Sequence, residues 1–295
     1  MKSCVEYDAT PKYSQKPPRP ASFLFVLDLS ISARKTEYLI SISKAIRRVL
    51  ADNTLWSKDS CIGFIGVHKN IELIDLSKKS TPHIYTIHST LKEVIPLPFE
   101  NFLLPIKEAT CLDSFLNSLP TLFNFDDNEL CLNEALCLSK LIFKANGGKM
   151  LLFVGAHDLT KIPQLNPSEL TGSKDGMNKL MLRTSDYYQQ LAQYLCIELT
   201  TSVDIYAIGN SYINLNTLGD LSHFSSGSIK YFNVDHNGTI DGFRLRKELI
   251  TCMAEEFGLD AYMRVRVSKG YNITSIIGNF NFKCNDLLVV PHIGQ

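Results

Sequence analysis

An uninterrupted apolar run near the N-terminus constrains the fold of this chain more than any other segment. Residues 22–27 (SFLFVL) carry no charge, and the run stops at Asp28. A short run of this kind, rich in Phe and Val, predicts a strand that is buried on both faces. Asp28 then lies at the carboxyl end of the strand, which is where open α/β sheets bind their ligands.

Strands and helices are predicted to alternate over most of the chain. Apolar runs predict further strands near 61–67, 149–155, 202–209 and 229–233, and a hairpin partner over 71–76. Amphipathic helices are expected near 34–51, 108–118, 130–145, 185–200, 214–224 and 241–257. Residues 77–106, which contain four prolines, are expected to be irregular. This alternation predicts an α/β fold, a doubly wound sheet with flanking helices.

The pattern changes near residue 259. Residues 263–268 (MRVRVS) alternate apolar and polar side chains, which predicts a strand with one solvated face, and more strand is expected over 271–282 and 286–290. These strands are expected to be antiparallel, unlike the alternation of helix and strand before them. The predicted organisation is an N-terminal strand and proline-rich lead-in at 1–20, an α/β trunk at 21–258, and antiparallel strands at 259–295 that are too few to close on their own.

Composition excludes several classes of protein. Hydrophobic residues make up 45% of the 295 residues and charged residues 20%, which is enough apolar sequence for a sizeable core. The net charge is zero, so nothing draws the chain as a whole toward nucleic acid or membranes. No segment approaches the ~20 apolar residues of a membrane-spanning helix, and the N-terminus lacks an apolar signal-peptide core. The eight Cys include no Cys-x-x-Cys pair, which favours reduced, packed thiols in a cytosolic protein.

The loop after the first strand resembles part of a metal site. Asp28, Ser30 and Ser32 have the Asp-x-Ser-x-Ser spacing found in the first of three ligand loops of von Willebrand A-type domains. The third loop of that site supplies an Asp shortly after a buried strand. Asp158 is the candidate here, although it follows its strand somewhat late.

The second ligand loop is where the match to the metal site fails. The expected Thr aligns with Leu130, while the oxygens of Glu129 and Asn133 stand at other offsets. Mg²⁺ demands near-ideal octahedral oxygen coordination, so a site that lacks one ligand and has another displaced should bind it poorly. We therefore expect no working metal site and interpret Asp28, Ser30, Ser32 and Asp158 as its degenerate remnant. A metal-dependent ligand-binding domain remains the alternative.

Catalytic signatures are missing from the sequence. The seven His are scattered, and no Gly-x-Ser-x-Gly, Walker A, His-Glu-x-x-His or Gly-x-Gly-x-x-Gly motif occurs. Because catalytic triads are defined in space rather than in sequence, an unrecognised hydrolase stays open as a third hypothesis. The expectation is a protein that is not an enzyme and has no catalytic residues.

A short basic row offers a candidate contact surface. Arg264, Arg266 and Lys269 are predicted to lie on or just after one strand, on its solvated side. An anionic membrane or an acidic partner surface could use such a row. The competing interpretation is simply the exposed side of a half-buried strand.

Several stretches, in order along nearly the whole chain, together resemble one family. They are residues 5–13, 17–20 and 25–30, Phe102-Leu103-Leu104-Pro105, residues 187–192 and 203–206, and above all 263–270 (MRVRVSKG), 278–280 and 286–288. These stretches resemble the trunk domain of the cargo-adaptor subunit of the inner COPII vesicle coat, of the Sec-twenty-four type.

The resemblance implies a fold and a function. It implies a von Willebrand A-like trunk whose end strands join a β-barrel, with no catalysis and no cofactor in this chain. Zinc is expected only in a zinc finger upstream of the matched segment. The implied partners are the sister GTPase-activating coat subunit in a heterodimer, cargo export signals and, peripherally, the endoplasmic reticulum membrane, but not nucleic acid. The expected role is a cytoplasmic scaffold in ER-to-Golgi vesicle transport.

Overall fold

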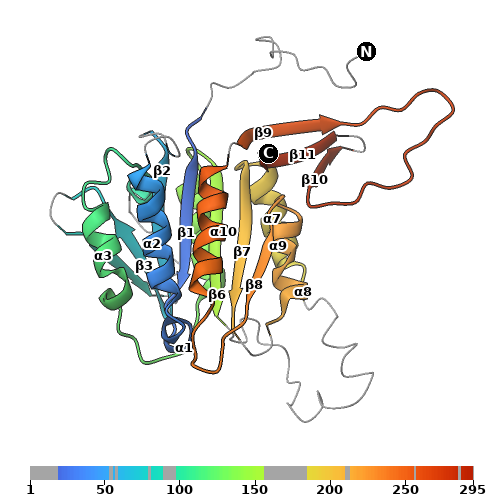
Figure 1. The fold of residues 1–295 in the computed structure, drawn as a ribbon. Coiled ribbons are helices and arrows are strands. Elements are labelled where there is room, and N and C mark those ends of the chain that lie inside the picture. Colours follow the sequence, from blue (N-terminus) through green and yellow to red (C-terminus); the bar gives the residue numbers. More distant parts are fainter. Residues whose placement is uncertain are drawn as a thin grey trace, which may run out of the picture.

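The fold is built on a large mixed sheet with helices on both faces (Figure 1). The computed structural model describes residues 19–52, 56, 59–78, 81–88, 98–155, 185–209, 213–255, 257–284 and 287–294. The sheet has the strand order β4-β3-β2-β1-β6-β7-β8, with β5 paired to β2. Its strands are β1 (Ser22–Asp28), β2 (Cys61–Val67), β3 (Asn70–Asp75), β4 (His83–His88), β5 (Leu104–Pro105), β6 (Gly148–Gly155), β7 (Thr201–Ile208) and β8 (Ile229–Phe232).

The strand β1 is the centre of this sheet and is parallel to β2 and β6 on either side. All seven of its residues are buried. Phe23 and Phe25 pack into the core on one face of the sheet, and Leu24 and Val26 pack into the core on the other. This arrangement explains the continuous apolar run, because a strand covered by helices on both faces has no solvated side.

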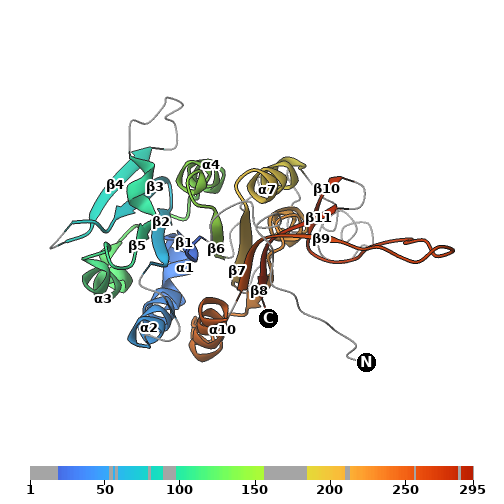
Figure 2. The ribbon, with the colours of Figure 1, turned by 90° about the horizontal axis from the view of Figure 1, so that it is seen from above.

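Two layers of helices cover the sheet, as Figure 2 shows. On one face lie α2 (Tyr38–Ala51), α3 (Leu112–Leu122) and α10 (Gly242–Ala254), and on the other lie α4 (Leu132–Phe143), α7 (Tyr187–Ile197) and α9 (Asp220–His223). The short elements are α1 (Ile31–Lys35), α8 (Leu215–Leu218) and the 3-10 turn η1 (Phe99–Phe102). Within the described ranges, no helix has the length and apolar character needed to cross a bilayer.

The helix predicted over 34–51 is two helices. The chain between α1 and α2 turns at Glu37, whose φ of 60° is left-handed, and a left-handed residue cannot continue an α-helix. The helix predicted over 214–224 is likewise divided at Gly219 into α8 and α9. Residues 77–106 are not wholly irregular, because they contain β4, η1 and β5. The edge strand β4 was not predicted because five of its six residues are polar or only half-buried.

A second, three-stranded antiparallel sheet follows the main one. Its order is β10-β11-β9, from β9 (Phe257–Arg264), β10 (Asn281–Cys284) and β11 (Leu287–Gly294). The antiparallel C-terminal sheet was predicted correctly, but the strands expected beyond Arg264 and over 271–280 were wrong. Residues 265–280 are almost entirely exposed and extend away from both sheets (Figure 1), so their alternation of side chains faces no core. The N-terminal strand expected within 1–20 lies outside the described residues, and closure into a barrel stays a prediction.

A buried polar cluster joins the two sheets. The ammonium group of Lys149 in β6 lies 2.9 Å from Oδ2 of Asp204 in β7, and the Ser228 N–H donates to Oδ1 of Asp204 at 2.7 Å. Burial opposes the charge of Asp204, but Lys149 and Ser228 outweigh it and hold the pKa of this carboxyl below its ordinary value. His292 of β11 is buried beside this pair. Burial, and then the charge of Lys149, lower the pKa of His292 from 6.5 to about 4.

The buried His292 makes stability dependent on pH. Because its pKa is lower in the folded state, the unfolded chain binds more protons between pH 6.5 and about 4, and stability falls as the pH is lowered through that window. We expect His292→Gln to flatten the dependence of the unfolding free energy on pH in this range. Urea denaturation at a series of pH values measures it, and an equally steep profile in the variant would refute the assignment.

Candidate functional site

The loop at the carboxyl end of β1 is closed around the carboxylate of Asp28. This side chain is only 2% exposed. Its Oδ1 accepts a hydrogen bond from the Ser30 N–H at 2.9 Å, and its Oδ2 accepts one from the Gly155 N–H at 2.7 Å. The Asp28 carbonyl oxygen also accepts from the hydroxyl of Tyr38 at 2.6 Å. Both carboxylate oxygens therefore bind backbone groups that tie β1 to β6 and to the start of α1.

The two serines of the loop bond to each other and to a residue that the sequence did not single out. Ser30 Oγ and Ser32 Oγ lie 3.4 Å apart, and both the hydroxyl and the N–H of Ser32 donate to Oδ1 of Asn128 at 3.3 Å. The Ile31 N–H donates to the Asp127 carbonyl at 3.1 Å. Asn128 thus supplies the oxygen that the second loop was expected to contribute.

The residues that the sequence singled out for the second loop do not bond to Ser32 as Asn128 does. Leu130 packs as a partly buried apolar side chain, and Glu129 is exposed. The amide oxygen of Asn133 accepts from the Tyr188 hydroxyl at 2.8 Å, away from the Asp28 loop. The sequence carries no local signal for Asn128, because this residue bonds to Ser32, which lies 96 residues away. Asp158, the fourth residue of the predicted remnant, lies outside the described residues.

Arg34 holds the second loop against the first. Its Nε donates to the Leu29 carbonyl at 3.0 Å and its Nη1 to the Phe123 carbonyl at 2.7 Å, while its Nη2 contacts the Phe125 carbonyl. One guanidinium therefore satisfies carbonyls from two segments that are about ninety residues apart in sequence. Burial, and then the negative charge of Asp28, raise the pKa of Tyr38 well above its ordinary value, so its hydroxyl stays a neutral donor.

The polar groups of this loop hold neighbouring parts of the protein together. The carboxylate, hydroxyl and amide groups bind one another or nearby backbone. Among the residues that the structure describes, no three His, Cys, Asp or Glu side chains gather closely enough to hold a metal ion.

The predicted basic row is not arranged on one strand. Arg264 is the last residue of β9 and pairs with Leu287, whereas Arg266 and Lys269 follow in the segment that leaves the sheet. All three side chains are exposed. Lys269 precedes Gly270, whose φ of 98° marks the expected turn.

The mixed sheet, its two helix layers and the Asp28 loop at the carboxyl end of the central strand define the class of protein. It is a von Willebrand A-like α/β domain, here followed by an antiparallel sheet. The family model described as the Sec23/Sec24 trunk domain matches residues 18–253, and the chain belongs to this family.

Its relatives are COPII coat proteins of the Sec24 type. The chain is 29% identical to protein transport protein SEC24 A of Arabidopsis thaliana over 99% of its length, and 29% identical to human Sec24A over 98%. It spans 28% and 27% of the length of these two relatives. The crystal structure of the human COPII-coat protein Sec24c, at 21% identity, superimposes with a TM-score of 0.81 over 97% of this chain and 39% of that one. The sequence-based family assignment is therefore confirmed.

Removing the hydrogen bonds of Asp28 should lower the free energy of unfolding. We expect Asp28→Ala to lower the unfolding free energy by about 2–5 kcal/mol, because it leaves two buried N–H groups without an acceptor at about 1–3 kcal/mol each. Asp28→Asn keeps one acceptor oxygen and should cost less. The exposed Asp113 in the first turn of α3 is the matched control, and Asp113→Ala should change stability by less than about 1 kcal/mol. Equal effects of the two alanine variants in urea denaturation would contradict the role given to Asp28.

Proposed function

We propose that this chain is a non-catalytic adaptor trunk of the COPII coat, acting in transport from the endoplasmic reticulum to the Golgi. The observation that carries the proposal is the family match over 18–253, joined to Sec24 relatives that align over nearly the whole chain. The Asp28 loop agrees with a scaffold, because its polar groups bind the protein's own backbone. The chain needs no metal or organic cofactor for this role, and zinc would belong to a finger upstream of the matched segment.

The proposed partners are the sister coat subunit, which activates the coat GTPase, and the export signals of cargo. The protein would be cytoplasmic and would lie peripherally on the endoplasmic reticulum membrane and on COPII vesicles. Exposed apolar side chains on the C-terminal sheet support a contact surface there, since single large apolar groups gathered on one sheet suit a protein interface. They are Tyr262, Met263, Phe282 and Ile293.

Arg264, Arg266 and Lys269 are proposed to belong to the same contact surface. They are exposed and lie at or just beyond the end of β9, next to the exposed apolar side chains of that sheet. Cations at the rim of an apolar patch steer an acidic partner, or an anionic membrane, without contributing much affinity individually.

The scaffold function predicts binding to the sister subunit without metal. The immobilised chain should retain a purified sister subunit of the Sec23 type in buffer that contains a chelator, since no step of the interaction requires a cation. A pull-down followed by gel densitometry measures it. If a correctly folded sister subunit does not bind, the proposal fails.

The basic row is tested in the same assay with a triple variant, Arg264→Glu, Arg266→Glu and Lys269→Glu. Loss of the sister subunit would place the row in the protein contact, and loss of co-sedimentation with phosphatidylserine vesicles would place it at the membrane. If neither measurement changes, the row is simply a solvated surface.

A metal-dependent ligand-binding domain is the second candidate. It is favoured by the oxygens of Ser30, Ser32 and Asn128, which gather beside Asp28. Against it, both Asp28 oxygens already accept hydrogen bonds from backbone N–H groups, and Mg²⁺ would have to compete with them.

The two candidates differ in their response to metal. A ligand that binds only the folded state at 100 times its Kd adds about 2.7 kcal/mol of stability. We expect millimolar Mg²⁺ or Mn²⁺ to leave the Tm unchanged. Thermal unfolding with and without each ion measures this. A rise in Tm that disappears in Asp28→Asn would favour the metal-binding domain instead.

A further inference from the structure

A groove between α2 and α10 is both recessed and strongly charged. The two helices lie side by side on the same face of the sheet (Figures 1 and 2). They approach closely at the start of α10, where a Cβ on Gly242 would lie 2.6 Å from the Ser41 hydroxyl. The groove beyond this contact has a volume of about 440 Å³ and is lined by Lys44, Arg48, Phe243, Arg246, Lys247, Ile250 and Thr251.

Four of the seven lining residues are cations, and none is acidic. This is a local concentration of charge in a chain whose net charge is zero. Among the residues that the structure describes, no carboxylate forms an ion pair with Lys44, Arg48, Arg246 or Lys247. The sequence alone could not bring Lys44 and Arg48 of α2 next to the cations of α10, because about 200 residues separate the two helices.

The acidic residues of α10 are engaged elsewhere. Asp241 caps the helix by accepting from the N–H groups of Phe243 and Arg244 at 3.1 and 3.0 Å. Glu248 pairs with Lys230 of β8 at 2.8 Å. Lys247 acts on Glu248 more weakly than Lys230 does, so the four cations leave the groove with a net positive potential.

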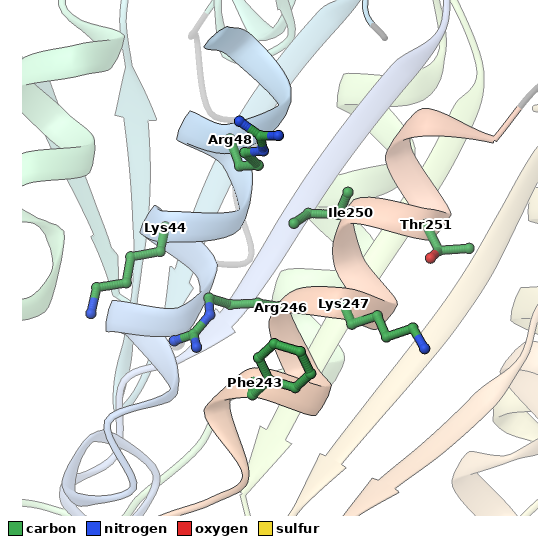
Figure 3. Close-up of a pocket in the computed structure, with 7 residues that line it drawn as sticks. All are labelled: Lys44, Arg48, Phe243, Arg246, Lys247, Ile250 and Thr251. Carbon is green, nitrogen blue, oxygen red and sulfur yellow. The ribbon is translucent and has the colours of Figure 1, made fainter. Parts of the chain in front are cut away.

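The middle of the groove is apolar. Phe243 is 71% exposed, and Ile250 lies two turns further along the same helix face. Figure 3 shows these two side chains along the groove, with Arg246 reaching toward α2 and with Lys44 and Lys247 directed to opposite sides. An exposed aromatic side chain close to several cations offers a partner protein both an apolar anchor and complementary charge.

We propose that the α2–α10 groove binds an acidic peptide segment of a partner protein, with an apolar side chain seated on Phe243 and Ile250 and flanking carboxylates beside the four cations. The apolar side chains of Phe243 and Ile250 argue against a ligand that carries only charge, such as inorganic phosphate. The recess between two helices argues against a flat bilayer, which cannot fill a concave surface. The site is separate from the Arg264 row, which lies at the end of β9.

The probe is a fluorescein-labelled peptide, Glu-Asp-Glu-Phe-Leu-Asp-Glu, titrated with the purified chain and followed by fluorescence anisotropy. One control peptide replaces Phe and Leu by Ser, and another replaces the acids by Gln and Asn. Saturable binding is expected for the first peptide only. Its affinity should fall as salt is added, since the cations are exposed or only partly buried.

Two double variants with the same change in net charge separate the groove from general electrostatics. Lys44→Glu with Lys247→Glu should weaken binding by about tenfold or more, because each reversal turns an attraction into a repulsion. Lys69→Glu with Lys144→Glu changes two exposed lysines far from the groove and should leave binding unchanged. Phe243→Ser, at an exposed site, should weaken the Phe-containing peptide and bring its affinity to that of the Ser-substituted one.

Four results would overturn the proposal. They are no saturable binding, equal weakening by both double variants, equal affinity for the Ser-substituted peptide, and an unchanged affinity in Phe243→Ser. Co-sedimentation with phosphatidylserine vesicles that is lost in the Lys44 and Lys247 variant, with no binding of the peptide, would assign the groove to a membrane surface instead. Thermal unfolding of every variant confirms that the comparison is made between folded proteins.

Discussion

The burial of β1 on both faces is the constraint on which the rest of the structure depends. Phe23 and Phe25 need one helix layer and Leu24 and Val26 need the other, so the central strand can carry no charge along its length. The first charge, Asp28, is therefore placed at the end of the strand, still only 2% exposed. A carboxylate buried there needs hydrogen-bond donors, and the N–H groups of Ser30 and Gly155 supply them.

As a result, the polar groups at the carboxyl edge of the sheet are engaged in hydrogen bonds within the protein. In an α/β fold this edge is where ligands normally bind. Here the Asp28 carboxylate accepts hydrogen bonds from backbone, and the serine hydroxyls bond to each other and to Asn128. The side chain of Arg34 holds the adjoining loop by donating to its backbone carbonyls. The surfaces that expose apolar or charged side chains are outer ones, namely the α2–α10 groove and both faces of the C-terminal sheet.

The central strands were predictable from sequence to within about a residue, because continuous burial leaves a continuous apolar run. The errors fall where burial is partial or where geometry is decided by distant residues. The left-handed Glu37 interrupts a helical pattern that its sequence continues. The alternation around Val265 and Val267 suits a strand, yet both side chains are exposed and face no core. Asn128 could not be found by spacing, since its position depends on the fold of a loop that Arg34 holds from about ninety residues away.

The polar cluster around Asp204 lies where the C-terminal sheet packs on the trunk. Leu288 and Val289 of β11 are buried, and the Cys196 thiol of α7 lies 3.9 Å from the Val289 carbonyl, so β11 packs directly on the trunk. His292 of the same strand lies beside Lys149 and Asp204 in β6 and β7. A shift of β11 by one residue would turn the buried His292 to the other face of the sheet. Because β9 pairs with β11 along its length, the packing of β11 on the trunk also sets the position of β9 and of Arg264 at its end.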